Sequence, residues 1–118
     1  MAKTINGSVG KGGMNRPADV VIVQYLLNCV PKSQGGPSEE LVLDGICGPR
    51  TNAAILSFQK KLAGSGLGWL DVGGPTLNAL RGFDPYPDYK LNLSGSKSSG
   101  KHVHIVKLGM PSSSVKDP

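Results

Sequence analysis

The sequence predicts a small, mostly helical protein whose centre is a bundle of three helices. Apolar residues recur at helical spacing in two stretches, residues 17–29 and 49–63. A Gly-Pro pair, which favours the first turn of a helix, introduces two of the three expected helices, at 48–49 and at 74–75. With 118 residues, the chain is long enough for one domain with a modest core and too short for two.

The first helix is expected over residues 17–29. Pro17 is acceptable in a first helical turn, and the charge of Asp19 complements the helix dipole there. Pro31 ends the helix, and the Gly-rich residues 1–16 form a lead-in before it. The apolar stripe of this helix consists of Val20, Val23, Leu26, Leu27 and Val30.

The second helix begins at Pro49, and Gly64 lies just past its end. Residues 31–40 before it have the composition of a loop, and the apolar run 41–43 is too short to assign. A third, short helix is expected from Pro75. The residues expected to face the core are Ala54, Ile55, Phe58 and Leu62 of the second helix, and Leu77 and Leu80 of the third.

After Arg81 the chain changes character, and the bundle core is expected to end there. Residues 83–118 are a tail rich in Pro, Ser and Lys. Apolar and polar residues alternate on both sides of a Ser/Gly/Lys-rich segment, which favours a β-hairpin over 89–107 and leaves a disordered tail as the alternative. The two histidines, His102 and His104, are too few for a metal site, and we expect them to be solvated.

One motif occurs twice. Its first copy is Asp44-Gly45-Ile46-Cys47-Gly48-Pro49-Arg50-Thr51-Asn52-Ala53-Ala54, and its shortened second copy is Asp71-Val72-Gly73-Gly74-Pro75-Thr76-Leu77-Asn78-Ala79-Leu80. Glycine permits a backbone shape closed to other residues, proline presets the first helical turn, and Asp and Thr satisfy exposed amides. Either copy alone is explained as a helix-start device. The two copies around one amphipathic helix predict an internal pseudo-twofold repeat.

These residues resemble the peptidoglycan-binding-like domain family. The family signature is similar to Asp44-Gly45-x-x-Gly48-Pro49-x-Thr51-x-x-Ala54-x-x-x-Phe58-Gln59, and its first helix to Asp19-Val20-x-x-Val23-Gln24-x-Leu26-Leu27-Asn28. Its second half-repeat is similar to Gly74-Pro75-Thr76-x-x-Ala79-Leu80. The likeness covers residues 17–81 and gives a domain over 17–82. It implies a three-helix bundle with a pseudo-twofold repeat and a shallow groove that binds cell-wall peptide or glycan without cleaving it.

The resemblance also implies partners: peptidoglycan or muropeptides, and a cell-wall hydrolase or a secretion-apparatus protein. The sequence departs from the family pattern at three places near the groove. Cys47 stands where an aromatic residue is common, the second copy lacks the glycine after its Asp, and the 31–43 loop is longer than usual. An alternative function is therefore a protein-interaction or structural module of a secretion or phage-like assembly, which kept the fold without the ligand.

Eight residues are candidate ligand contacts around the Asp44–Thr51 loop. Arg50 is either a fork for a stem-peptide carboxylate or a plain solvated arginine, and the only Trp either stacks on a sugar or packs in the core. Gln24 and Gln59 lie on apolar helices, where a structural hydrogen bond competes with ligand contact. The candidates are Gln24, Tyr25, Asp44, Gly45, Gly48, Arg50, Thr51 and Trp69.

No residue pattern indicates catalysis, a metal or a cofactor, and we expect a non-catalytic protein. Asp44 and Asp71 lie in Gly-bearing turns, where capping of local amides is favoured over acid/base chemistry. Cys29 and Cys47 lack a CxxC partner or a nearby His, and reduced thiols are favoured over a disulfide.

Charge and hydropathy bear on partners and location. The net charge of +5 is dispersed, whereas nucleic-acid binding usually clusters Lys and Arg on one face, so we expect no nucleic-acid partner. No apolar stretch reaches the length of a membrane span, and the first residues lack the apolar region of a secretory signal. We expect the protein to be cytoplasmic as made. If the cell wall is its target, it reaches the periplasm or the outside by a non-classical route.

Overall fold

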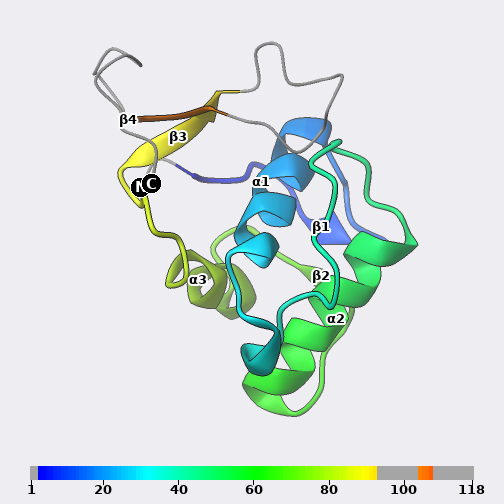
Figure 1. Cartoon of the computed structure of the whole chain (residues 1–118). Helices are drawn as coiled ribbons and strands as arrows, with labels where there is room; N and C mark the ends of the chain where they lie inside the picture. Colours follow the sequence, from blue (N-terminus) through cyan, green and yellow to red (C-terminus); the bar gives the residue numbers. More distant parts are fainter. Residues whose placement is uncertain (1–2, 93–103, 108–118) are drawn as a thin grey trace.

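Three α-helices and two pairs of short strands make up the parts of the chain that the structure describes, residues 3–92 and 104–107 (Figure 1). The structure is a computed structural model. In Figure 1, α1 lies between α2 and α3, and it contacts both. In chain order the elements are β1 (Val9–Gly10), α1 (Pro17–Asn28), η1 (Lys32–Gln34), α2 (Pro49–Ala63), β2 (Trp69–Leu70), α3 (Pro75–Arg81), β3 (Tyr89–Asn92) and β4 (His104–Lys107).

All three α-helices begin at a proline, as the sequence predicts. The residue before each proline is extended, which is the conformation that a following proline ring favours. α2 ends at Gly64, whose φ of +82° is left-handed and whose amide donates to the carbonyl of Lys60 at 2.7 Å. The helix boundaries therefore follow from local chain chemistry.

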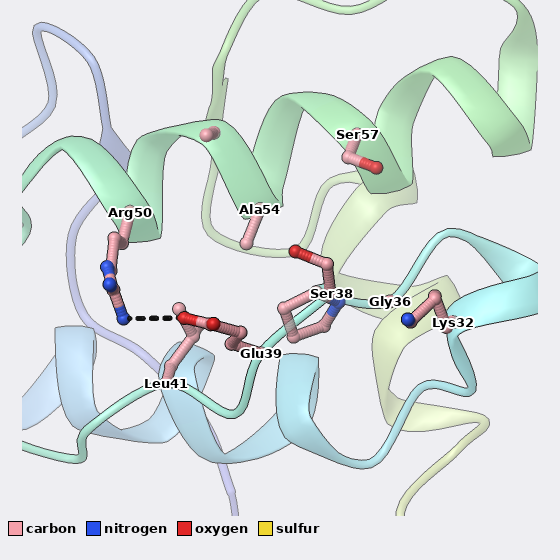
Figure 2. A pocket seen from close by; sticks show the side chains of 10 residues that line it. Lys32, Gly36, Ser38, Glu39, Leu41, Arg50, Ala54 and Ser57 are labelled. Atoms are coloured by element: carbon pink, nitrogen blue, oxygen red, sulfur yellow. Dashed lines mark ion pairs between the residues drawn. The ribbon is translucent and has the colours of Figure 1, made fainter.

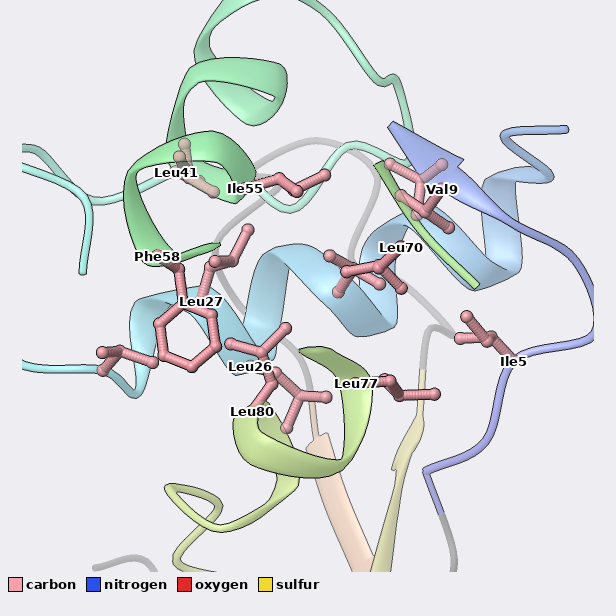
Figure 3. Packing of buried hydrophobic residues seen from close by; sticks show 14 residues of the cluster. Ile5, Val9, Leu26, Leu27, Leu41, Ile55, Phe58, Leu70, Leu77 and Leu80 are labelled. Carbon is pink, nitrogen blue, oxygen red and sulfur yellow. The ribbon is translucent and has the colours of Figure 1, made fainter. Parts of the chain in front are cut away.

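The apolar stripes of the helices meet in one core. Figure 3 shows Phe58 of α2 packed beside Leu26 and Leu27 of α1, with Leu80 of α3 next to them. The apolar 41–43 run has no regular structure. The buried core cluster consists of Ile5, Val9, Val20, Val23, Leu26, Leu27, Val30, Leu41, Ala54, Ile55, Phe58, Leu70, Leu77 and Leu80.

One stripe residue is not in the core: the expectation for Leu62 is wrong, because this side chain is 49% exposed. The chain turns back at Gly64, and the segment that follows is held against Gln59, one turn before Leu62. A Cβ on Gly66 would lie 2.4 Å from the Cβ of Gln59, which shows how closely this segment approaches. The last turn of α2 therefore extends past the packed part of the bundle.

The residues before α1 take part in the core. Lys3, Ile5, Gly7 and Val9 are buried while the residues between them are more exposed, an alternation typical of extended chain. β1 pairs antiparallel with β2, with Val9 opposite Leu70. The Gly-rich lead-in is thus a structural part of the fold.

The segment after α3 also packs on the bundle, although the buried core cluster itself ends at Leu80. The ring of Phe83 meets the ring of Phe58 edge to face, with centroids 6.0 Å apart. Farther along, β3 pairs antiparallel with β4, with Leu91 opposite Ile105, as the favoured β-hairpin requires. Residues 93–103, which include His102, and 108–118 lie outside the described part of the tail.

A buried lysine joins these two flanking segments. The side chain of Lys3 is 2% exposed, and its ammonium lies 2.8 Å from a carboxylate oxygen of Asp84, which is 3% exposed. The same ammonium donates to the carbonyl oxygens of Tyr86 and Tyr89, at 2.6 and 2.5 Å. An ammonium has three donors, and here all three have acceptors. The buried charge is therefore paired and fully hydrogen-bonded.

The core assignment predicts opposite outcomes for two apolar truncations on α2. Phe58→Ala should lower the free energy of unfolding by about 3–5 kcal/mol, because it removes a buried ring and leaves a cavity. Leu62→Ala should change it by no more than about 0.5 kcal/mol, because the side chain is half exposed. Urea denaturation followed by circular dichroism measures both. Equal effects of the two substitutions would show that the core is misassigned.

We predict that removing one partner of the buried ion pair lowers the free energy of unfolding more than removing both partners. Lys3→Met should cost about 3–5 kcal/mol of unfolding free energy, because it leaves the Asp84 carboxylate buried without its counter-charge. The double substitution Lys3→Met with Asp84→Leu should recover most of that loss. A double mutant that is less stable than Lys3→Met, measured by the same denaturation, would argue against this role.

Candidate functional site

The amide of Gln24 holds the first motif loop in place. This side chain is 1% exposed on α1. Its Oε1 accepts from the backbone amide of Gly45 at 3.0 Å. Its Nε2 lies within 3.0–3.1 Å of three acceptors: Asp44 Oδ1, the Ile46 carbonyl and Thr51 Oγ1. Gln24 thereby fastens residues 44–46 of the loop between α1 and α2 to the bundle.

Gln59 makes the matching set of bonds on α2. Its Oε1 accepts from the amide of Gly68 at 2.9 Å, and its Nε2 donates to the Trp69 carbonyl at 2.8 Å and to Thr76 Oγ1 at 3.2 Å. Both networks join a left-handed glycine, the carbonyl of the next residue and a threonine in the first turn of the following helix. The two glycines have φ angles of +73° for Gly45 and +84° for Gly68.

The hydrogen bonds of the two glutamines pair different glycines from those that the two motif copies align. The sequence aligns Asp44-Gly45 with Asp71-Val72, which makes the second copy appear to lack its glycine. The hydrogen bonds instead match Gly45 with Gly68, three residues before Asp71. The spacing from this glycine to the threonine differs between the copies, and a comparison by sequence alone does not find the correspondence.

The structural role proposed for the glutamines is the one observed. Gln24 and Thr51 are buried, at 1% and 4% exposure, and they bond to each other. The hydroxyl of Thr51 accepts from Gln24, and no side chain caps the N-terminus of α2, where the N-cap residue is Gly48. Asp44 does satisfy a local amide, since it accepts from Ile46 N at 2.9 Å. Capping was therefore predicted correctly for Asp44 and wrongly for Thr51.

A shallow hollow of about 220 Å³ lies beside this loop. Asp44 and Arg50 supply one charge of each sign, and Ile46 is 67% and Val42 45% exposed at its edge. Five of the eight candidate residues line it. Its lining consists of Gln24, Leu41, Val42, Asp44, Ile46, Gly48, Pro49, Arg50 and Thr51.

The other three candidates are not in this lining. Gly45 packs against Pro17, since a Cβ on it would lie 3.0 Å from the Pro17 carbonyl oxygen. Tyr25 follows Gln24 by one residue, which turns it about 100° around the helix, and its hydroxyl donates to Asp84 Oδ1 at 3.5 Å. Trp69 belongs to the second network, through Gln59. Tyr25 and Trp69 therefore do not line this hollow.

A second, larger hollow of about 410 Å³ lies between the 32–41 segment and α2 (Figure 2). Here the guanidinium of Arg50 lies 3.2 Å from a carboxylate oxygen of Glu39, with both side chains about three-quarters exposed. Neither role expected for Arg50 included this ion pair. No sequence pattern assigned a role to Lys32, Ser38, Glu39 or Ser57, and the unusual length of the loop was the one available clue.

A third hollow, of about 440 Å³, adjoins the second network. Leu62 and Leu67, which are 49% and 72% exposed, lie at its surface, and Gln59, Thr76 and Ala79 contribute to its lining. Each glutamine network thus has a surface hollow beside it.

Both cysteines are free thiols and half-buried. Burial raises the pKa of each thiol above its ordinary value, so both are protonated at neutral pH. Burial likewise raises the pKa of Tyr25, with a further contribution from Cys29 beside it. Among the described residues, no three His, Cys, Asp or Glu side chains are grouped as metal ligands, and no helix is long and apolar enough to span a membrane.

Comparisons of the chain with protein-family models, with curated proteins and with solved structures found no match. The resemblance to the peptidoglycan-binding-like family therefore rests on the motif residues themselves.

The two networks predict similar losses for two glutamine substitutions. Gln24→Leu and Gln59→Leu should each lower the free energy of unfolding by about 1–3 kcal/mol, because buried backbone groups lose their hydrogen-bond partners. Gln34→Leu, at an exposed position of η1, is the control. Hydrogen exchange should quicken at Gly45 in the first variant and at Gly68 in the second. Exchange that stays slow at these amides would contradict the assigned roles.

Proposed function

We propose that this chain is a non-catalytic module that binds bacterial peptidoglycan, by its stem peptide or its glycan, in the hollow beside the Asp44–Thr51 loop. One observation carries the proposal. Gln24 holds the loop rigidly from within, while Asp44, Ile46 and Arg50 of the same loop and helix start remain exposed on its outer side. A loop fixed in this way loses little conformational entropy when it binds a ligand.

The positive charge at one side of the hollow suits an anionic group of a ligand. Arg50 presents a guanidinium, and the N-terminus of the 15-residue helix α2 adds a partial positive charge without a side-chain cap. Stem peptides of peptidoglycan carry free carboxylates, which a guanidinium binds through paired hydrogen bonds. Exposed Ile46 and Val42 offer apolar contact to the rest of the ligand.

The matched bonds of Gln24 and Gln59 support the pseudo-twofold repeat that the family resemblance implies. We infer from this likeness that the chain belongs with the peptidoglycan-binding-like domains. Such a module works beside a cell-wall hydrolase or a secretion-apparatus protein, and it reaches the wall by a non-classical route.

A second candidate function is an interaction module that kept the fold and lost the ligand. Two observations favour it. Cys47 occupies the position of the common aromatic residue, and the guanidinium of Arg50 is paired with Glu39. Under this proposal the exposed Val42 and Ile46 contact another protein of a secretion or phage-like assembly.

Binding of soluble muropeptides to the isotope-labelled chain tests the first proposal. A shallow site on a small domain should bind with roughly micromolar to millimolar affinity. Amide shifts in NMR spectra should cluster on residues 44–51, and Arg50→Gln should weaken them while the exposed Arg16→Gln does not. The muropeptides should remain intact throughout.

The same experiment separates the two candidates. The protein should also be retained on insoluble, purified sacculi, and Arg50→Gln should reduce that retention. If millimolar muropeptide causes no shifts and sacculi do not retain the protein, peptidoglycan binding is ruled out and the interaction module is favoured.

A further inference from the structure

We propose that the hollow between the 32–41 segment and the first half of α2 is a second ligand site. It takes a short peptide with small side chains and a free C-terminal carboxylate. In the absence of that ligand, Glu39 occupies the place of its carboxylate at Arg50. The second hollow shares only Leu41 and Arg50 with the hollow of the proposed function, so this inference does not depend on peptidoglycan binding.

Small side chains on α2 create the space. Ala53, Ala54 and Ser57 line the helix side of the hollow, and their spacing places them on neighbouring turns of one face. Larger side chains there would fill the gap under the loop. The resulting volume of about 410 Å³ falls in the range of small-ligand pockets.

The loop over this space is fixed at both ends. A Cβ on Gly36 would lie 1.9 Å from the carbonyl oxygen of Val30, and a Cβ on Gly35 would lie 2.9 Å from the Cβ of Lys61. At the other end, the side chain of Asn28 bonds both the amide and the carbonyl of Leu41, at 2.8 and 2.9 Å. The hollow is therefore preformed, which favours binding because the loop need not be ordered by the ligand.

The charges around the hollow favour a carboxylate. Figure 2 shows Arg50 and Lys32 at opposite ends, with Ala54 and Ser57 on the helix side between them. Glu39 is the only acidic residue among the ten that line the hollow. A carboxylate bound at Arg50 would have the second cation of Lys32 within the same site.

The ion pair of Arg50 with Glu39 is of the kind that a ligand can replace. It is a single contact of 3.2 Å, and the side chains are 76% and 74% exposed. Exposed ion pairs contribute little to stability, whereas a carboxylate bound to a guanidinium in bidentate geometry makes two parallel hydrogen bonds. Displacing Glu39 thus exchanges a weak contact for a stronger one.

The remaining lining favours a peptide over a bare anion. Leu41, Pro37 and the two alanines give apolar surface, and Ser38 and Ser57 give hydroxyls that can bond peptide amides. An inorganic anion at Arg50 would leave the apolar surface in water. A large side chain would meet the walls that the loop and α2 form.

Acetyl-alanyl-alanine, in its L,L and D,D forms, is the probe for the full chain, and the corresponding carboxamide is the matched control. NMR titration should give amide shifts at residues 36–39 and 53–57, with the carboxamide at least about tenfold weaker. Binding by either stereoisomer supports the site, and a preference between them distinguishes a cell-wall source from a protein C-terminus.

Three variants test the roles of single residues. Glu39→Gln should tighten binding of the acid about two- to fivefold, because the internal competitor is removed. Arg50→Gln should weaken it at least about tenfold. Asp88→Asn removes the same charge as Glu39→Gln at an exposed position outside the hollows, and it should leave the affinity unchanged.

A fourth variant keeps this test separate from that of the proposed function. Ala53→Leu fills only the second hollow, at an exposed position that should not disturb folding, and it should abolish dipeptide binding while retention on sacculi stays unchanged. The proposal is overturned if neither stereoisomer binds, if the acid and the carboxamide bind equally, or if Glu39→Gln fails to tighten binding.

Discussion

A buried primary amide must bond at both of its ends, and this requirement organises the molecule. Gln24 and Gln59 each lie on a helix face that is mostly apolar, and their oxygens and nitrogens bond to the loop and the helix start that follow. In each loop a left-handed glycine donates its backbone amide to the glutamine oxygen, and a threonine at the next helix start accepts from the glutamine nitrogen. The helices are thus tied in sequence, α1 to the start of α2 and α2 to the start of α3.

This constraint also determines which residues are available to a ligand. Thr51 and Gln24 face inward and are used by the fold, while Asp44, Ile46 and Arg50 are left on the outside. Arg50 stands where two hollows meet, one formed by the motif loop and one by the longer loop before it. The guanidinium of Arg50 therefore borders both the hollow beside the Asp44–Thr51 loop and the hollow under the 32–41 segment.

Features that depend on neighbouring residues, such as helix starts, could be predicted from the sequence, whereas features that depend on contacts between distant residues could not. Gly-Pro pairs and apolar stripes were enough for the helix starts and most of the core. Lys3 was missed, because a charged residue in a Gly-rich segment is normally exposed, and its burial depends on Asp84 far along the chain. The hollow between the 32–41 segment and α2 was missed for a similar reason. Gly35 lets the loop approach α2, and Gly36 lets it approach the carbonyl of Val30, and no helix or strand pattern encodes these contacts.

The position of Lys3 has a consequence for how the protein is made. Its ammonium bonds the carbonyl of Tyr86, 83 positions later, and β1 pairs with a strand that follows α2. A ribosome adds about 5–20 residues each second, so the first segment waits several seconds for its partners. During that interval Val9 also lacks Leu70, its partner across the β1–β2 pair, until that strand is made. Contacts of such long range close slowly in small domains, and those of Lys3 can form only after residues 84–89 have been made.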